Sequence, residues 1–173
     1  MNYLWIKAAA VAALAASTVQ VANAGVFNLT ADGEWLEFLV IDSASTWLDL
    51  SGEEAQFVFT SSAPFFLRIT DINFPGDSVQ VLVNGVLLGS TPDVGYSLDA
   101  YADTAGVAWG DMTWSQRNWE LPMGQYTFTG GPMNVPSEAT SFAISVTAVP
   151  EPETWAMLLV GLMGVFRWAR PKA

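Results

Sequence analysis

The chain has 173 residues and a formal net charge of −11, with six basic residues, seventeen acidic residues, no histidine and no cysteine. These absences exclude Ser-His and Cys-His nucleophile systems, zinc sites with nitrogen or sulfur ligands, and disulfide bonds. Between residues 25 and 149 there is no lysine, so a Ser-Lys system is excluded as well. That span has two arginines against fifteen acids, a net charge of −13, and we expect no nucleic-acid partner.

The first 24 residues have the order of a secretory signal peptide. Lys7 gives one positive charge, residues 8–16 form a short apolar run, and the segment ends in Ala22-Asn23-Ala24. Small residues at Ala22 and Ala24 form the pattern that signal peptidase cleaves. We therefore expect cleavage before Gly25 and export across the inner membrane.

Residues 25–148 show the pattern of a β-sandwich. Short runs rich in aromatic and β-branched residues alternate with Gly, Pro, Ser and Asp, and no run keeps a helical period. About seven short strands fit an antiparallel, jelly-roll-like sandwich, held without disulfides. The predicted strands are residues 35–42, 56–60, 64–71, 79–83, 86–88, 125–129 and 140–147.

Alternation within these strands predicts which side chains enter the core. Phe65, Leu67 and Ile69 share one side of their strand. The other inward candidates are Tyr126, Phe128, Phe142, Ile144 and Val146.

Asn84-Gly85 predicts a hairpin with a type I′ turn between residues 79–83 and 86–88. A two-residue turn pairs Val83 with Val86 on one face and Leu82 with Leu87 on the other. The same register pairs Val81 with Leu88. Because both faces of the hairpin are apolar, we expect it to be central in its sheet.

The acidic residues offer two kinds of site. Asp71 and Asp77 bracket a loop and are candidate calcium ligands, although the same composition also suits an ordinary turn. A glycosidase would need two acids close together in a groove. The available glutamates, which the pattern otherwise leaves on the solvated surface, are Glu34, Glu37, Glu53, Glu54 and Glu120.

Trp109, Trp114 and Trp119 lie in a segment that also contains Gly and Asp. Exposed tryptophan rings can stack on the apolar faces of sugars, so these three residues are candidates for glycan binding. The alternative is that they fill the core of a small domain without disulfides.

Residues 149–173 combine a proline-rich motif, a short apolar segment and a basic end. The motif is Val149-Pro150-Glu151-Pro152-Glu153 with Thr154, the apolar segment covers residues 155–168, and residues 167–173 include Arg167, Arg170 and Lys172. The prolines keep the motif extended, and the apolar segment, a predicted short helix, is marginal as a permanent anchor because a spanning helix needs about 20 residues. The basic residues should stay on the cytoplasmic side.

This order resembles the PEP-CTERM sorting signal of Gram-negative bacteria. The resemblance implies that an inner-membrane exosortase recognises the tail and removes it. Residues 69–89 and 121–127 are similar to a β-sandwich domain common among secreted PEP-CTERM proteins, which implies no particular chemistry.

The sequence leaves three functions open. The preferred one is a non-enzymatic surface or extracellular-matrix protein, without a cofactor and associated with exopolysaccharide. The second is a carbohydrate-binding module that uses the tryptophans. The third is a carboxylate glycosidase.

Overall fold

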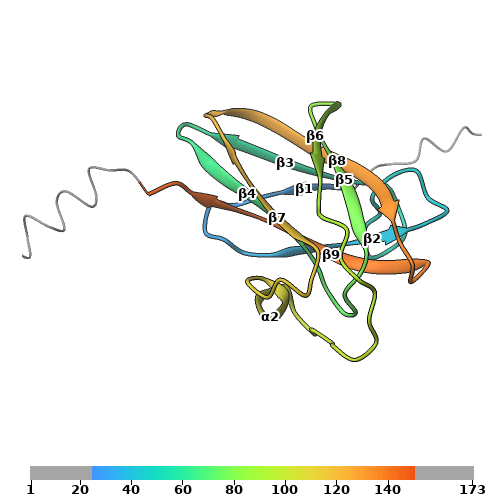
Figure 1. Ribbon diagram of the computed structural model, residues 1–173. Coiled ribbons are helices and arrows are strands. Elements are labelled where there is room, and N and C mark those ends of the chain that lie inside the picture. The colour runs from blue at the N-terminus through green and yellow to red at the C-terminus, as the bar shows by residue number, and fades with distance from the viewer. Residues whose placement is uncertain (1–24, 151–173) are drawn as a thin grey trace, which may run out of the picture.

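The computed structural model describes residues 25–150, which form two β-sheets packed face to face (Figure 1). One sheet has five strands in the order β1-β3-β8-β5-β6, and the other has four in the order β2-β9-β4-β7. Neighbouring strands are antiparallel except β1 and β3, which are parallel. The predicted antiparallel β-sandwich is confirmed. The strands are β1 Gly25–Asn28, β2 Leu36–Ile41, β3 Ala55–Ser61, β4 Phe65–Asp71, β5 Ser78–Val83, β6 Val86–Ser90, β7 Gln116–Leu121, β8 Gly124–Asn134 and β9 Ala139–Ala148.

Every strand predicted from the sequence has a counterpart, but β1 and β7 were not predicted. β1 has four residues and pairs in parallel with β3 at the edge of its sheet. β7 has polar residues at most positions and exists as a strand because it pairs with β4. The short helix α2, Ala105–Ala108, was not predicted either.

The predicted signal peptide, residues 1–24, and the predicted C-terminal helix, residues 155–168, lie outside the described residues. Within residues 25–150, no helix is both long enough and apolar enough to cross a membrane.

The core lies between the two sheets, and the predicted inward faces are confirmed. Tyr126 is half-buried against the core, whereas the other predicted inward residues are buried: Phe65, Leu67, Ile69, Phe128, Phe142, Ile144 and Val146. Trp47, which is fully buried, packs against the rings of Phe38 and Phe57, with centroid distances of 4.5 and 6.3 Å.

The β5–β6 hairpin differs from its prediction in two respects. Asn84 and Gly85 both have positive φ, 51° and 78°, as a type I′ turn requires, and the pairs Val83–Val86 and Leu82–Leu87 form. However, a register shift between Val81 and Leu82 pairs Val81 with Gly89 instead of Leu88. The predicted central position is also wrong, because β6 is an edge strand. Two of its apolar side chains, Val86 at 70% and Leu87 at 62%, are largely exposed, whereas Leu88 packs against the core.

The two ends of the described chain lie at opposite ends of the sandwich (Figure 1). Gly25 pairs with Ala55, the first residue of β3. At the far end, Val149 donates a backbone hydrogen bond to Pro64, just after β3 has ended at Ser61. The seven residues of β3 separate these ends by about 20 Å. The predicted signal-peptide cleavage site before Gly25 and the start of the tail at Val149 therefore lie in different places on the domain.

Candidate functional site

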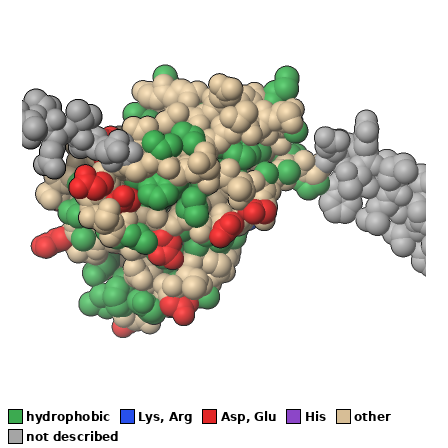
Figure 2. Space-filling model, turned by 180° about the vertical axis from the view of Figure 1, so that it is seen from behind, with side chains coloured by type: hydrophobic (Ala, Val, Ile, Leu, Met, Phe, Trp, Pro, Cys, Tyr) green, Lys and Arg blue, Asp and Glu red, His purple; other side chains and the backbone are tan. Residues whose placement is uncertain are grey.

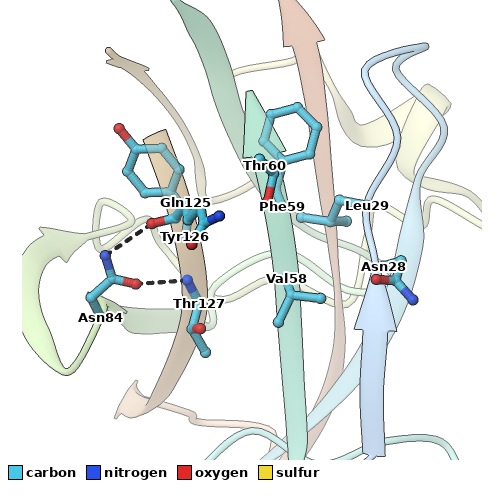
Figure 3. Close-up of a pocket in the computed structure, with 9 residues that line it drawn as sticks. All are labelled: Asn28, Leu29, Val58, Phe59, Thr60, Asn84, Gln125, Tyr126 and Thr127. Carbon is cyan, nitrogen blue, oxygen red and sulfur yellow. Dashed lines mark hydrogen bonds between the residues drawn. The ribbon is translucent and has the colours of Figure 1, made fainter. Parts of the chain in front are cut away.

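A shallow depression lies on the outer face of the five-stranded sheet, over β1, β3 and β8 and beside the β5–β6 turn (Figure 3). Its volume is about 600 Å³, and it is lined by Asn28, Leu29, Val58, Phe59, Thr60, Asn84, Gln125, Tyr126 and Thr127. A second depression of about 710 Å³ adjoins it and shares Asn84 and Thr127. Together we call these two depressions the sheet groove.

Asn84 shapes the middle of the sheet groove. Its side-chain Nδ2 donates a hydrogen bond to the carbonyl oxygen of Gln125 at 3.2 Å, and its Oδ1 accepts one from the backbone N–H of Thr127 at 2.8 Å (Figure 3). The amide thus continues the pairing of β5 with β8 past the end of β5. None of these residues was predicted from the sequence as a site residue. The sequence pattern that could have identified them is the lack of charged residues at the outward positions of the strands predicted at 56–60 and 125–129.

The three tryptophans that are candidates for glycan binding do not form one surface. Trp114 is only 5% exposed, and its Nε1 donates to the carbonyl oxygen of Asn73 at 3.4 Å. Trp114 therefore follows the core alternative and belongs to a small core cluster with Ile72 and Ala143. Trp119 is half-buried on β7, opposite Leu67, where it contacts the guanidinium of Arg117 at 5.3 Å.

Trp109 takes part in a separate cluster, on the outer side of the four-stranded sheet. The guanidinium of Arg68 lies 4.9 Å from the ring of Trp35 and 5.4 Å from that of Trp109, and the two rings are 5.4 Å apart. Arg68 Nη2 donates to Ser145 Oγ at 2.8 Å, and burial lowers the pKa of Arg68. This arrangement attaches the end of α2 to the sheet.

Asp71 and Asp77, the calcium candidates, come together in the fold, and both are fully buried. Asp71 accepts hydrogen bonds from the backbone N–H of Asp77 and from Thr140 Oγ1, and Ser137 Oγ donates to Asp77 at 2.8 Å. Burial, and then the neighbouring charge of Asp77, raise the pKa of Asp71 to about 8. In the described part of the chain, no group of three His, Cys, Asp or Glu side chains is placed to hold a metal ion. Calcium binding by the pair stays a prediction.

The candidate acids for a glycosidase lie on separate elements. Glu37 is exposed on β2 and Glu120 on β7, the two edge strands of the four-stranded sheet. Three strand spacings, about 14 Å, already separate β2 from β7, and this exceeds the roughly 5 to 10 Å between the acids of most glycosidases. Glu34 and Glu53 are exposed in loops, and Glu54 is half-buried just before β3.

The tail starts where the sandwich ends. β9 pairs with β2 on one side and with β4 on the other, and it ends at Ala148. Residues 148–170 match the family model for the PEP-CTERM protein-sorting motif. The chain carries a PEP-CTERM sorting motif. This motif implies export, a membrane-anchored sorting signal before processing, and exosortase-dependent sorting to the outside of the cell.

A search of curated protein sequences gave no match to this chain. Among solved structures, the chain is similar to the pre-peptidase C-terminal domain of a collagenase from Bacillus anthracis, with 11% identity, a TM-score of 0.41, and coverage of 72% of this chain and 94% of that one. It is also similar to CorA, a surface-associated copper-binding protein of Methylomicrobium album BG8, with 10% identity, a TM-score of 0.41, and coverage of 73% and 98%. A third similar structure is a β-glucosidase from Paenibacillus barengoltzii, with 16% identity, a TM-score of 0.39, and coverage of 73% and 12%.

Proposed function

We propose that this protein is a non-enzymatic surface or extracellular-matrix protein that an exosortase sorts and that associates with exopolysaccharide. The observation that carries the proposal is the position of the sorting motif, which follows directly on a core strand of a folded sandwich. Signal peptidase would release the N-terminus at Gly25, at the opposite end of the domain. The exported unit is then a compact domain with both processing sites at its margins.

The composition favours a binding role over catalysis. The chain has no histidine or cysteine, and its exposed glutamates lie on separate elements. Asp71 and Asp77 are adjacent but fully buried, out of reach of a substrate. An association with other macromolecules needs no catalytic group, and the high acidity of the domain keeps it soluble outside the cell.

The tryptophan-based form of the carbohydrate-binding alternative has little support. Trp114 is buried, Trp119 faces the core side of β7, and Trp109 packs on Trp35 and Arg68. A glycan platform at these three residues would require them to rearrange.

Intact mass spectrometry of protein recovered separately from membranes and culture medium tests the sorting step, in strains with and without their exosortase. We expect a form that starts at Gly25 and ends near Pro150 only where the exosortase is present. A mass that includes Lys172 and Ala173 in both strains would contradict the proposal. Association with the matrix is tested by co-fractionation with exopolysaccharide, compared with a strain that makes none.

A further inference from the structure

The outer face of the five-stranded sheet is a polar but uncharged surface. Side chains alternate along a strand, so the residues between the core-facing phenylalanines point outward. On β1, β3 and β8 these outward residues have amide, hydroxyl and aliphatic side chains, which lie in three cross-strand rows. The rows are Thr60 with Gln125, Asn28 with Val58 and Thr127, and Val26 with Gln56. None of these side chains is charged, although residues 25–149 have fifteen acids.

The same lack of charge holds in the sheet groove. Among the residues that line its two depressions, only Glu54 is charged, and it belongs to the second depression. On the face seen in Figure 2, acidic side chains are scattered and no basic side chain is visible. Apart from Glu54, the groove is therefore an uncharged strip on a strongly acidic domain.

Several polar groups in the groove are available to a ligand. Within the described residues, no hydrogen bond engages the side chains of Asn28, Thr60 or Gln125, and all three residues are exposed. Thr60 and Gln125 are direct cross-strand partners, so their side chains are neighbours on one face. Asn84, in contrast, uses its amide to fix the groove. Rigid strands thus present unpaired amide and hydroxyl groups at fixed spacings (Figure 3).

We infer that the sheet groove binds a neutral polysaccharide chain, and this inference rests on the proposed association with exopolysaccharide. Amides and hydroxyls pair with sugar hydroxyl groups, while Val58 and Leu82 offer aliphatic contact to the apolar faces of sugar rings. An acidic polysaccharide is disfavoured because the groove has no basic side chain and the domain has a net charge of −13. The two aromatic residues that line the groove, Phe59 and Tyr126, pack into the core, so the specificity comes from hydrogen bonding across the strands.

Affinity electrophoresis of the mature protein, purified after export, tests this inference. The probes are the neutral and acidic fractions of the host exopolysaccharide, cast separately into native gels. We expect the neutral fraction to slow the protein and the acidic fraction to leave its mobility unchanged. The Thr60→Ala/Gln125→Ala variant should bind about tenfold more weakly, since it loses two hydrogen-bonding side chains.

The matched control is Asn118→Ala/Thr147→Ala, which removes an amide and a hydroxyl from the other sheet. It should bind like the wild type, and circular dichroism checks that both variants are folded. Equal retardation of the two variants, or no retardation by the neutral fraction, overturns the inference. A wild-type dimer in light scattering that Thr60→Ala/Gln125→Ala dissociates would overturn it too, because the groove would then be a contact between copies.

The two proposals can fail separately. If the protein co-fractionates with exopolysaccharide but both double variants bind alike, the sheet groove is not the binding site and the proposed function stands. If it does not co-fractionate in the strain that makes exopolysaccharide, the proposed function itself fails.

Discussion

The backbone N–H of Val149 donates a hydrogen bond to the carbonyl oxygen of Pro64 at 3.2 Å. Val149 belongs to the matched sorting motif, and Pro64 immediately precedes β4. The motif is thus joined to the corner between β3 and β4, and processing close to Pro150 would cut the chain just outside the sandwich.

We therefore predict that a chain ending at Pro150 keeps the stability of the domain, whereas one ending at Glu138 does not fold. β9 lies between β2 and β4 and contributes the buried side chains of Phe142, Ile144 and Val146. Thermal unfolding followed by circular dichroism compares both truncations with the full chain. A cooperative transition in the shorter one would show that β9 is dispensable.

The buried carboxyl of Asp71 predicts an unusual pH dependence. Its pKa rises from an ordinary 3.8 to about 8, so between these pH values the folded state holds a proton that the unfolded state has lost. The contribution of Asp71 to the free energy of unfolding is therefore complete below pH 3.8 and is lost as the pH rises through about 8. Urea unfolding at several pH values should show this decline in the wild type and a smaller one in Asp71→Asn. If the free energy of unfolding falls equally with pH in the wild type and in Asp71→Asn, the decline comes from other titratable groups.

The same samples test calcium. Calcium binds charged carboxylates, so binding at Asp71 and Asp77 predicts that calcium raises the Tm of the wild type above pH 8 and leaves that of Asp71→Asn unchanged. An unchanged Tm in the wild type contradicts the calcium prediction.

Gly130 of β8 is required by close packing. A Cβ at this position would overlap the carbonyl oxygen of Gln80 and lie 2.5 Å from the ring of Trp47. Gly130→Ala should lower the free energy of unfolding by about 3 kcal/mol, because backbone and a buried ring must both move. Gly106 of α2 is the control, since a Cβ there meets nothing within 4 Å. Gly106→Ala should raise stability by up to about 1 kcal/mol.

Arg68 should contribute more to stability than Arg117. Its guanidinium is half-buried, lies over two tryptophan rings and donates to Ser145, whereas that of Arg117 is exposed, lies over Trp119 alone and donates to the carbonyl oxygen of Ser90. We expect Arg68→Ala to cost about 2 kcal/mol in urea unfolding, and Arg117→Ala about half a kcal/mol. A loss of order near α2 should accompany the first change, seen as altered tryptophan fluorescence. Equal costs would mean that the double stacking adds nothing.

Local patterns in the sequence determined much of this protein. Alternation in residues 64–71 and 140–147 identified the strands and their buried faces, because side chains alternate in an extended chain whatever its neighbours. Asn84-Gly85 identified the turn for the same local reason. The order of motif, apolar segment and basic end identified the sorting signal.

Tertiary structure alone decided how these elements combine. β1 and β7 exist because β3 and β4 are available to pair with them, and the apolar β5–β6 hairpin lies at an edge because β8 occupies the inner position. Burial of Trp114 and the meeting of Asp71 with Asp77 depend on the packing of loops onto a sheet. The sheet groove likewise joins residues from β1, β3 and β8, strands that are adjacent in space but separated along the chain. No local period records such contacts, since they arise only when distant segments pair.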